Sequence, residues 1–285
     1  MNKNPQTHII DGKSIAARLR ETLAEEITRR NLTPGLAVIL VGDDPASHVY
    51  VRNKMTACEK TGIKSFEHRL GQDSRKEDIA ALITALNNDS QVHGILLQLP
   101  LPPALAAVQE ELIQMIAPHK DVDGLTVTNA GKLILGMPDG MVPCTPQGSL
   151  LLIKEIQKDL TGCHAVIIGR SSLFGKPMGQ LLLAENCTVT QCHSKTRDLP
   201  SLCRQADILV VAVGRPHMVK GDWIKPGAIV IDVGINRTPE GTLVGDVDFD
   251  EAVKTAAAIT PVPGGVGPMT IACLLRNTVR AAGEL

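Results

Sequence analysis

The chain has 285 residues, enough for one large or two medium-sized domains. Its 29 basic and 30 acidic residues leave a net charge of −1, which gives no support for nucleic-acid or membrane binding. With one Trp, one Tyr and three Phe, the core must be aliphatic, and short runs of Val, Ile, Leu and Ala favour parallel sheets covered by helices.

The seven cysteines are odd in number and include no CxxC pair. This pattern predicts reduced thiols in the cytoplasm rather than a disulfide framework or a zinc site. The histidines show no metal-binding spacing, so we expect no metal. The first residues, MNKNPQTHIIDGKS, lack the apolar segment of a signal peptide, and no apolar run approaches the ~18 residues of a membrane span.

The first part of the chain alternates between predicted helices and strands. Apolar residues recur every four positions from Ile15 to Ile27, which predicts a helix over 12–31. Ser74 and Glu77 form a capping-box pattern at the start of a later helix. The further helices are expected at 46–61, 74–88 and 104–116, and the strands at 36–42, 63–69 and 93–98. This order is typical of a parallel α/β sheet.

A second α/β set follows the segment Gly136–Pro146, whose three prolines and two glycines mark a domain junction. We expect helices at 147–158 and 269–282, and strands at 165–169, 188–191, 208–213 and 228–233.

The segment AVIIGRSSLFGKPMGQLLL joins a buried strand to a helix through a turn rich in glycine. Gly169 would allow the turn, Gly175 a close backbone approach, and Gly179 close packing of the helix on the sheet. The helix start would offer free N–H groups to a pyrophosphate. The spacing is not GxGxxG, so an ordinary α/β turn is the alternative.

The end of the next strand would meet the adenosine ribose of a bound dinucleotide. An acidic residue there favours NAD, but 191–197 reads QCHSKTR and contains no carboxylate. Arg170 adds a further positive charge within the turn. These charges suit the 2′-phosphate of NADP, and the alternative is a basic surface loop.

Four other segments carry side chains suited to chemistry. Tyr50 and Lys54 are four apart and share a helix face, and Gln98 ends a buried strand where ligands collect. KDVDG (120–124) places two carboxylates in a turn, and the PVPGGVGPMT segment (261–270) precedes the last helix. Each segment also has an ordinary explanation. Tyr50 and Lys54 could be a surface pair, and Gln98 could hydrogen-bond to the backbone of its loop. KDVDG could serve as a turn and helix cap, and PVPGGVGPMT as a rigid hinge.

Several short segments point to one family when they are taken in order. They are YVRNK (50–54), QLPLP (98–102), KDVDG (120–124), PCTPQG (143–148), GRSSLFGKP (169–177), VGIN (233–236), GDV (245–247) and PGGVGPMT (263–270). Together they resemble the bifunctional methylenetetrahydrofolate dehydrogenase/methenyltetrahydrofolate cyclohydrolase family. The similarity extends from Ile10 to the final helix, and the third and last segments with QLPLP are its most specific parts.

The resemblance implies two α/β domains with a cleft between them. An N-terminal folate-binding catalytic domain would comprise 1–145 and 265–285. A Rossmann-like domain with a mostly parallel sheet, 146–264, would bind NADP. The implied activity in one-carbon metabolism is NADP-dependent oxidation of methylenetetrahydrofolate to methenyltetrahydrofolate, followed by hydrolysis to 10-formyltetrahydrofolate. Bacterial members are usually cytoplasmic homodimers.

The resemblance also implies roles for individual residues. Lys54 would be the catalytic lysine, Tyr50 would line the folate pocket, Gln98 would position Lys54, and Asp121 would grip the pterin. NADP would contact Gly169, Arg170, Ser171, Ser194 and Ile235. The substrate-binding residues would be Tyr50, Lys54, Leu97, Gln98, Leu99, Asp121, Pro263, Gly264, Gly265, Gly267, Pro268 and Thr270.

The chemistry of the reaction agrees with these roles. The methenyl intermediate is a cation, so the pKa of Lys54 should fall toward neutrality, and the neutral amine could assist water attack. A monofunctional dehydrogenase is the main alternative, although Lys54 and Gln98 are both present. A non-catalytic regulator would be expected to lack Lys54 or Asp121. A shikimate-type dehydrogenase would explain the cofactor turn but not KDVDG or PGGVGPMT.

Overall fold

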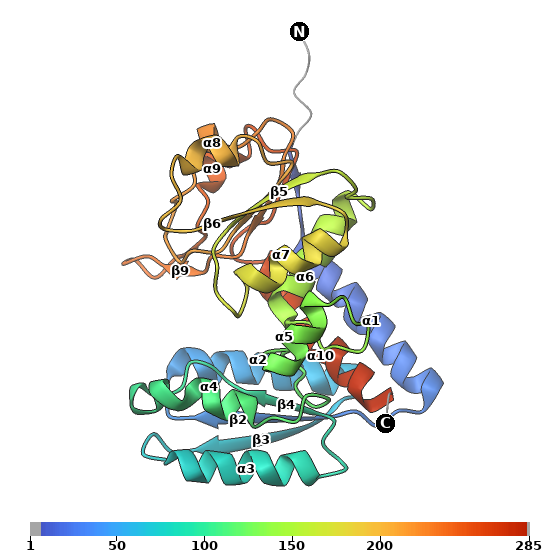
Figure 1. Cartoon of the computed structure of the whole chain (residues 1–285). Helices are drawn as coiled ribbons and strands as arrows, with labels where there is room; N and C mark the ends of the chain where they lie inside the picture. The colour runs from blue at the N-terminus through green and yellow to red at the C-terminus, as the bar shows by residue number, and fades with distance from the viewer. Residues whose placement is uncertain (1–6, 284–285) are drawn as a thin grey trace. The chain divides into compact units, whose positions relative to one another are not determined.

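Strand β2 (Gly35–Val41) is buried along its whole length and forms the centre of a three-stranded parallel sheet in this computed structural model (Figure 1). Strands β3 (Lys64–Leu70) and β4 (Gly94–Leu97) pair with it on either side. A strand covered on both faces must be apolar at every position, which explains the unbroken run from Leu36 to Val41.

Helices cover this sheet. Helix α2 (Pro45–Thr61) packs against β2 and β3, and the Asp44 carboxylate caps its start by accepting from Ser47 N at 2.8 Å. Helices α3 (Lys76–Asn88) and α4 (Gln109–Gln114) share an apolar core with β2 and β4. The other helical elements here are the 3₁₀ turn η1 (Pro103–Val108), α5 (Val127–Ile134), and parts of α1 (Gly12–Arg30) and α10 (Val266–Gly283).

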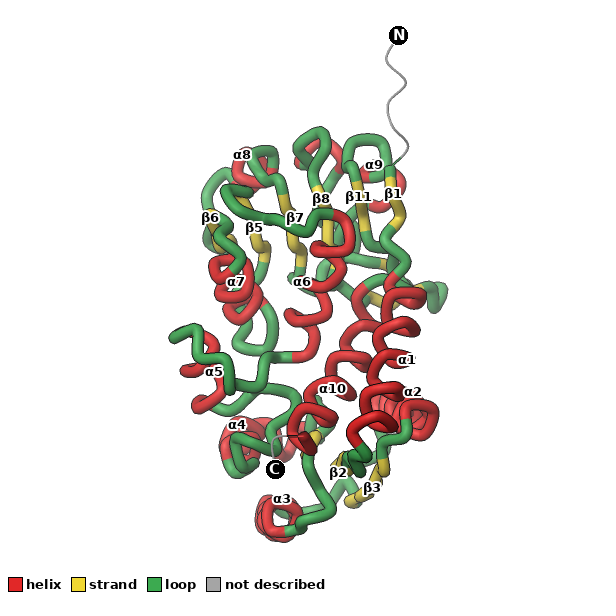
Figure 2. The backbone as a smooth tube through the Cα atoms, turned by 90° about the vertical axis from the view of Figure 1, so that its right-hand side faces the viewer, coloured by secondary structure: helices red, strands yellow, loops and turns green. Residues whose placement is uncertain are grey.

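A second sheet holds six parallel strands in the order β1-β11-β8-β7-β5-β6, seen side by side in Figure 2. They are β1 (His8–Ile9), β11 (Ala258–Ile259), β8 (Ile229–Asp232), β7 (Ile208–Val211), β5 (His164–Ile168) and β6 (Thr188–Cys192). Its unit also contains α6 (Cys144–Ile156) apart from its first residue, α7 (Gly175–Ala184), α8 (Leu199–Cys203), η2 (Gly221–Trp223), α9 (Phe249–Ala252) and the antiparallel pair β9 (Asn236–Arg237) and β10 (Leu243–Val244).

The structure describes residues 7–283, and their contacts divide the chain into two units. One unit comprises 17–144 with the chain from 271 onward, and the other comprises the chain up to 16 with 145–270. The predicted α/β class with mostly parallel sheets is confirmed. Within the described part of the chain, none of the helices combines the length and apolarity needed to cross a membrane.

Some predicted elements differ in detail. The N-cap of α3 is Arg75 rather than Ser74, and its capping-box partner is Asp78 rather than Glu77, since the Asp78 carboxylate accepts from Arg75 N at 3.0 Å. The helix predicted over 104–116 is divided into η1 and α4. The short strands β1, β9, β10 and β11 and the helix α5 were not predicted.

Candidate active site

Lys54 and Gln98 come from different elements and are joined by a hydrogen bond. Lys54 lies on α2, and Gln98 directly follows β4. Lys54 Nζ donates to Gln98 Oε1 at 2.8 Å, and Gln98 Nε2 donates to the carbonyl oxygen of Leu99 at 2.6 Å. Because the Leu99 carbonyl fixes the amide nitrogen, the amide oxygen faces the lysine. The structure therefore brings together two of the predicted catalytic residues.

The surroundings of Lys54 favour its neutral form. Burial lowers the pKa of the Lys54 ammonium, and the nearby Asp123 carboxylate partly opposes this effect. Burial raises the pKa of Asp123, and Lys54 acts in the opposite direction. One turn after Lys54, burial raises the pKa of the Cys58 thiol to about 12, so this thiol stays protonated and is no nucleophile.

The other predicted residues near this pair differ in their exposure. Tyr50 lies one helical turn before Lys54, and 44% of its surface is exposed. Leu97, the last residue of β4, is buried in the core that the sheet shares with α3 and α4, and Leu99 packs against the same core. Tyr50 therefore offers a side chain to a ligand, whereas Leu97 can offer only its backbone.

Asp121 has a different setting from the one expected of a pterin ligand. It is 1% exposed, and its Oδ1 accepts from Leu125 N at 3.1 Å. Its Oδ2 accepts from Thr126 N at 2.8 Å and from Asn129 Nδ2 at 2.9 Å. A carboxylate enclosed and bonded in this way holds the turn before α5. Asp123, two residues later, is the carboxylate that lies near Lys54, a role that the KDVDG pattern alone does not indicate.

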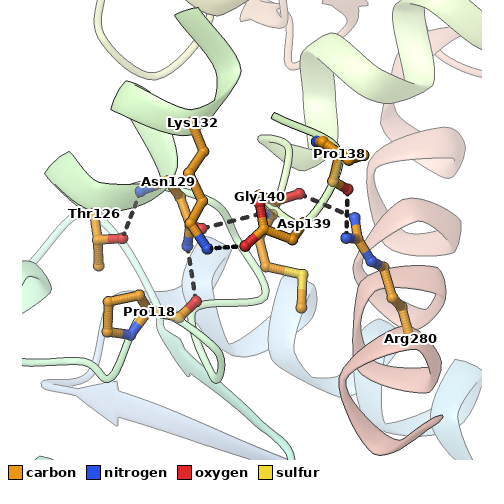
Figure 3. Close-up of polar contacts among 9 residues, drawn as sticks. Pro118, Thr126, Asn129, Lys132, Pro138, Asp139, Gly140 and Arg280 are labelled. Atoms are coloured by element: carbon orange, nitrogen blue, oxygen red, sulfur yellow. Dashed lines mark hydrogen bonds and ion pairs between the residues drawn. The ribbon is translucent and has the colours of Figure 1, made fainter. Parts of the chain in front are cut away.

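Asn129 links the chain segments on both sides of Asp123 (Figure 3). Its Nδ2 donates to the carbonyl oxygen of Pro118 at 2.9 Å, and its Oδ1 accepts from Met141 N at 3.0 Å. Arg280, on α10, donates to two carbonyl oxygens of the segment 138–140 at 2.7 and 2.9 Å. These bonds fix the turn that carries Asp123 relative to the segment that precedes α6.

The side chain of Asn277, on α10, holds the backbone of the same turn. Its Nδ2 donates to the carbonyl oxygens of Val122 and Val142 at 2.8 and 2.9 Å. Cys144 Sγ also donates to the carbonyl oxygen of Val122, at 3.3 Å. The position of Asp123 thus depends on residues from α6 and α10 that are distant in the sequence.

The dinucleotide-type turn lies between β5 and α7. Gly169 has φ +138°, and a Cβ there would come 2.5 Å from the carbonyl oxygen of Ala212. A Cβ at Gly175 would overlap the carbonyl oxygen of Gly169. The backbone cradle predicted from these two glycines is therefore present. The prediction that close packing of the helix on the sheet requires a glycine at 179 is wrong. A Cβ at Gly179 would lie 3.5 Å from its nearest neighbour, which is an ordinary contact.

Ser171 stabilises this turn, since its Oγ accepts from Phe174 N at 3.1 Å. The turn after β6 is closed by two hydrogen bonds of 2.8 Å between His193 and Thr196. Side chains exposed at these two turns are Arg170, Ser171, Ser194, Lys195 and Arg197. Their positive charges suit a phosphate group.

The remaining predicted residues also belong to the unit with the six-stranded sheet. Ile235, between β8 and β9, is 49% exposed. The segment 263–270 is tightly packed at Gly265, whose carbonyl oxygen would overlap a Cβ at Gly12. Helix α10 begins at Val266, three residues before the predicted start. The substrate-binding role of Pro263, Gly264, Gly265, Gly267, Pro268 and Thr270 stays a prediction.

Two family models match the chain. The catalytic domain of tetrahydrofolate dehydrogenase/cyclohydrolase matches residues 10–123, and the NAD(P)-binding domain of the same family matches residues 143–285. The chain belongs to the tetrahydrofolate dehydrogenase/cyclohydrolase family. The resemblance noted from the short segments is thereby confirmed, as is the two-domain α/β fold.

Individual relatives are similar to this dehydrogenase/cyclohydrolase over nearly the whole chain. Bifunctional protein FolD of Sphingopyxis alaskensis is 59% identical, covering 98% of this chain and 94% of its own. The bifunctional FolD structure from Campylobacter jejuni has a TM-score of 0.94 and 47% identity, covering 98% and 99%. The FolD structure from Trypanosoma brucei, complexed with NADP cofactor and inhibitor, has a TM-score of 0.92 and 38% identity, covering 98% of each chain.

Proposed function

We propose that this enzyme oxidises methylenetetrahydrofolate to methenyltetrahydrofolate and then hydrolyses the product to 10-formyltetrahydrofolate. NADP, when bound, accepts the hydride of the first step. The family models and the bifunctional relatives support both activities. The single observation that carries the second activity is the partly buried hydrogen bond between Lys54 and Gln98.

The hydrolytic step needs a base, because water adds to a cation and must release a proton. Burial lowers the pKa of Lys54, so its neutral amine is available closer to neutral pH than that of an ordinary lysine. A neutral amine that donates one hydrogen to Gln98 keeps its lone pair for the proton of the attacking water. Gln98 is accordingly a positioning residue for Lys54.

Asp123 is our choice for the carboxylate that binds the pterin, in place of Asp121. A pterin edge presents adjacent N–H donors, which one carboxylate can accept together. The oxygens of Asp121 already accept from its own turn, whereas Asp123 lies near Lys54. Tyr50, exposed one turn from Lys54, would line the same pocket.

The NADP site would use the turn from Gly169 to Gly175. The backbone there leaves no room for a Cβ, as a cradle for a pyrophosphate requires. Gly169, Arg170 and Ser171 would contact the cofactor, together with Ser194 and Ile235. The positive charges of Lys195 and Arg197 would favour the 2′-phosphate.

This cofactor assignment can be tested by charge reversal. The double substitution Lys195→Glu and Arg197→Glu should raise the KM for NADP and leave the KM for NAD nearly unchanged, because only NADP carries the 2′-phosphate. Lys158→Glu, at an exposed site elsewhere in the same unit, is the matched control. An unchanged ratio of the two KM values would refute the role of the basic turn.

The two activities are separated by supplying their substrates in turn. Wild-type enzyme should consume methenyltetrahydrofolate without NADP, and should form NADPH from methylenetetrahydrofolate. Lys54→Gln should abolish the first reaction, whereas Lys60→Gln, exposed on the same helix, should not. Hydrolysis by the Lys54 variant would contradict our assignment of the base. NADPH formation without hydrolysis by the wild type would favour the monofunctional alternative.

We also propose that the enzyme is a cytoplasmic homodimer, with folate binding by 1–145 and 265–285 and NADP binding by 146–264. All seven cysteines are free thiols, as a reducing compartment favours. Beside strand β3 lies an open hollow of about 360 Å³. Its lining carries charges of both signs, Arg52, Glu59, Glu67 and Arg69, which suits a self-complementary contact. Sedimentation of a Glu59→Arg variant should give a lower mass than wild type.

A further inference from the structure

Two buried carboxylates, Asp232 and Asp246, lie together near the carboxyl end of strand β8. Asp232 is 4% exposed and Asp246 is fully buried. Asp246 N donates to Asp232 Oδ1 at 3.0 Å. A Cβ at Gly234 would overlap the Asp246 carboxylate, and one at Gly245 would overlap the Asp232 carboxylate. The glycines of the VGIN and GDV segments therefore make room for this pair, which the proposed function does not use.

The Asp246 carboxylate accepts from three consecutive backbone N–H groups. Its Oδ2 accepts from Val213 N at 2.6 Å and Gly214 N at 3.0 Å, and its Oδ1 accepts from Arg215 N at 2.7 Å. Gly214 has φ +64°, which helps successive N–H groups to face one anion. The side chain of Asp246 thus determines the shape of the turn that follows β7.

This turn lies at the place in the sheet where a dinucleotide is expected to bind. Strand β5 pairs with β6 on one side and with β7 on the other, so the chain changes direction across the sheet at β5. In such sheets, ligands bind at the carboxyl ends of the strands beside this change. Gly169, at the end of β5, directly adjoins the carbonyl oxygen of Ala212, at the end of β7.

Asp246 also contacts the second segment that is expected to meet the cofactor. Its Oδ1 accepts from Asn236 Nδ2 at 2.9 Å, and Asn236 follows the exposed residue Ile235. The Asp232 carboxylate is itself braced by Gly234 N at 3.0 Å and Val247 N at 2.8 Å. One carboxylate therefore joins the turn after β7 to the segment between β8 and β9.

We propose that Asp246 is a positioning residue for the dinucleotide, whose carboxylate holds the 213–215 turn and Asn236 in the arrangement that receives NADP. Asp232 supports it by fixing the backbone of Asp246. This inference rests on the proposed NADP-dependent function. It assigns a role to the VGIN and GDV segments.

The test is the substitution Asp246→Asn in the full chain. The new amide group would place N–H donors against the N–H groups of the turn. Losing a charge-assisted hydrogen bond of this kind should raise the Kd and KM for NADP by about tenfold or more. Hydrolysis of supplied methenyltetrahydrofolate needs no NADP, so its kcat and KM should stay at wild-type values. Calorimetric titration with NADP measures the affinity independently of turnover.

Asp248→Asn is the matched control, because Asp248 is a nearby carboxylate that caps α9 and Asn caps a helix equally well. It should leave NADP affinity unchanged. Asn236→Ala, which removes a donor without leaving a backbone N–H unpaired, should weaken NADP binding to a smaller extent and serves if Asp246→Asn does not fold.

Three outcomes would overturn the inference. Unchanged NADP affinity in Asp246→Asn, or in Asn236→Ala if the first variant does not fold, would refute the positioning role of Asp246 but leave the proposed NADP-dependent function intact. An equal loss of hydrolysis and NADP binding, with a lowered Tm, would indicate a merely structural role. Failure of the wild-type protein to bind NADP would reject the proposed function itself, and the inference with it.

Discussion

Lys54 Nζ and Gln98 Oε1 are 2.8 Å apart, and the Leu99 carbonyl oxygen keeps the Gln98 amide in the orientation that this bond requires. Gln98→Glu would place a carboxylate against the lysine and raise the pKa of Lys54, because an opposite charge stabilises the ammonium. We expect hydrolysis at neutral pH to fall roughly tenfold or more and the pH–rate profile to move to higher pH. An unmoved profile would contradict the role of Gln98.

A matched control for this change exists in the same unit. Lys64 Nζ donates to Gln91 Oε1 at 2.7 Å in an exposed pair. Gln91→Glu repeats the same lysine–glutamine change away from the proposed site, and it should leave the profile unchanged. A shift in both variants would show that the effect is one of net charge.

The pH dependence of wild-type hydrolysis follows from the lowered pKa of Lys54. A base acts when it is deprotonated, so the rate should rise with pH and reach half its maximum below the ordinary lysine value of about 10.4. The folded chain binds the Lys54 proton less tightly than the unfolded chain does. The free energy of unfolding should therefore increase as the pH rises from the lowered pKa of Lys54 in the folded chain to its ordinary value in the unfolded chain. Rates at constant ionic strength, corrected for uncatalysed hydrolysis, provide the check. A rate that falls with pH would be incompatible with a lysine base.

The two aspartates of KDVDG should behave differently on replacement by asparagine. Asp121→Asn leaves an amide donor against backbone donors of its own turn, so unfolding in urea should show a loss of about 1–3 kcal/mol. Asp123→Asn should preserve most of the stability but raise the KM for the folate substrate. The opposite result, with the KM changed by Asp121→Asn and the stability by Asp123→Asn, would support Asp121 as the pterin-binding residue, as the family resemblance implied.

Two glycines of helix α7 provide a matched pair of alanine substitutions. Gly175→Ala forces a methyl group onto the carbonyl oxygen of Gly169, so NADPH formation should be lost while hydrolysis of supplied methenyltetrahydrofolate continues. Gly179→Ala meets only ordinary contacts, and it should stabilise the helix by about 0.5–1 kcal/mol without affecting NADP binding. Thermal unfolding and NADP titration of both variants test this contrast.

Most long elements were predictable because they are local patterns. The apolar run of β2 and the strand–turn–helix at Gly169 can be read from neighbouring residues. The two-residue strands β1 and β11 cannot, because His8 pairs with Ala258 across most of the chain. Helix α5 was missed because it spans only eight residues, too few for a repeating apolar pattern to stand out, and its apolar face is not buried, with Val127 71% and Ile134 64% exposed.

The resemblance to the family, rather than residue type or spacing, led us to expect that Lys54 and Gln98 meet, and the hydrogen bond between them confirms that contact. The KDVDG pattern could not show whether Asp121 or Asp123 faces the site, because both lie in one turn. Only the hydrogen bonds from Thr126 and Asn129 to Asp121 distinguish them. The sequence also could not show that Gly179 has room for a Cβ, because the need for a glycine depends on neighbours that are distant in the sequence.

The single tryptophan, Trp223, packs against the core of the unit with the six-stranded sheet, and the single tyrosine, Tyr50, is on α2 in the other unit. Fluorescence excited where only indole absorbs therefore reports on one unit alone, whereas far-ultraviolet circular dichroism reports on the helices of both. Coincident unfolding curves from the two signals would mean that the units unfold as one cooperative body. Separate curves would give each unit its own stability, without any engineered probe.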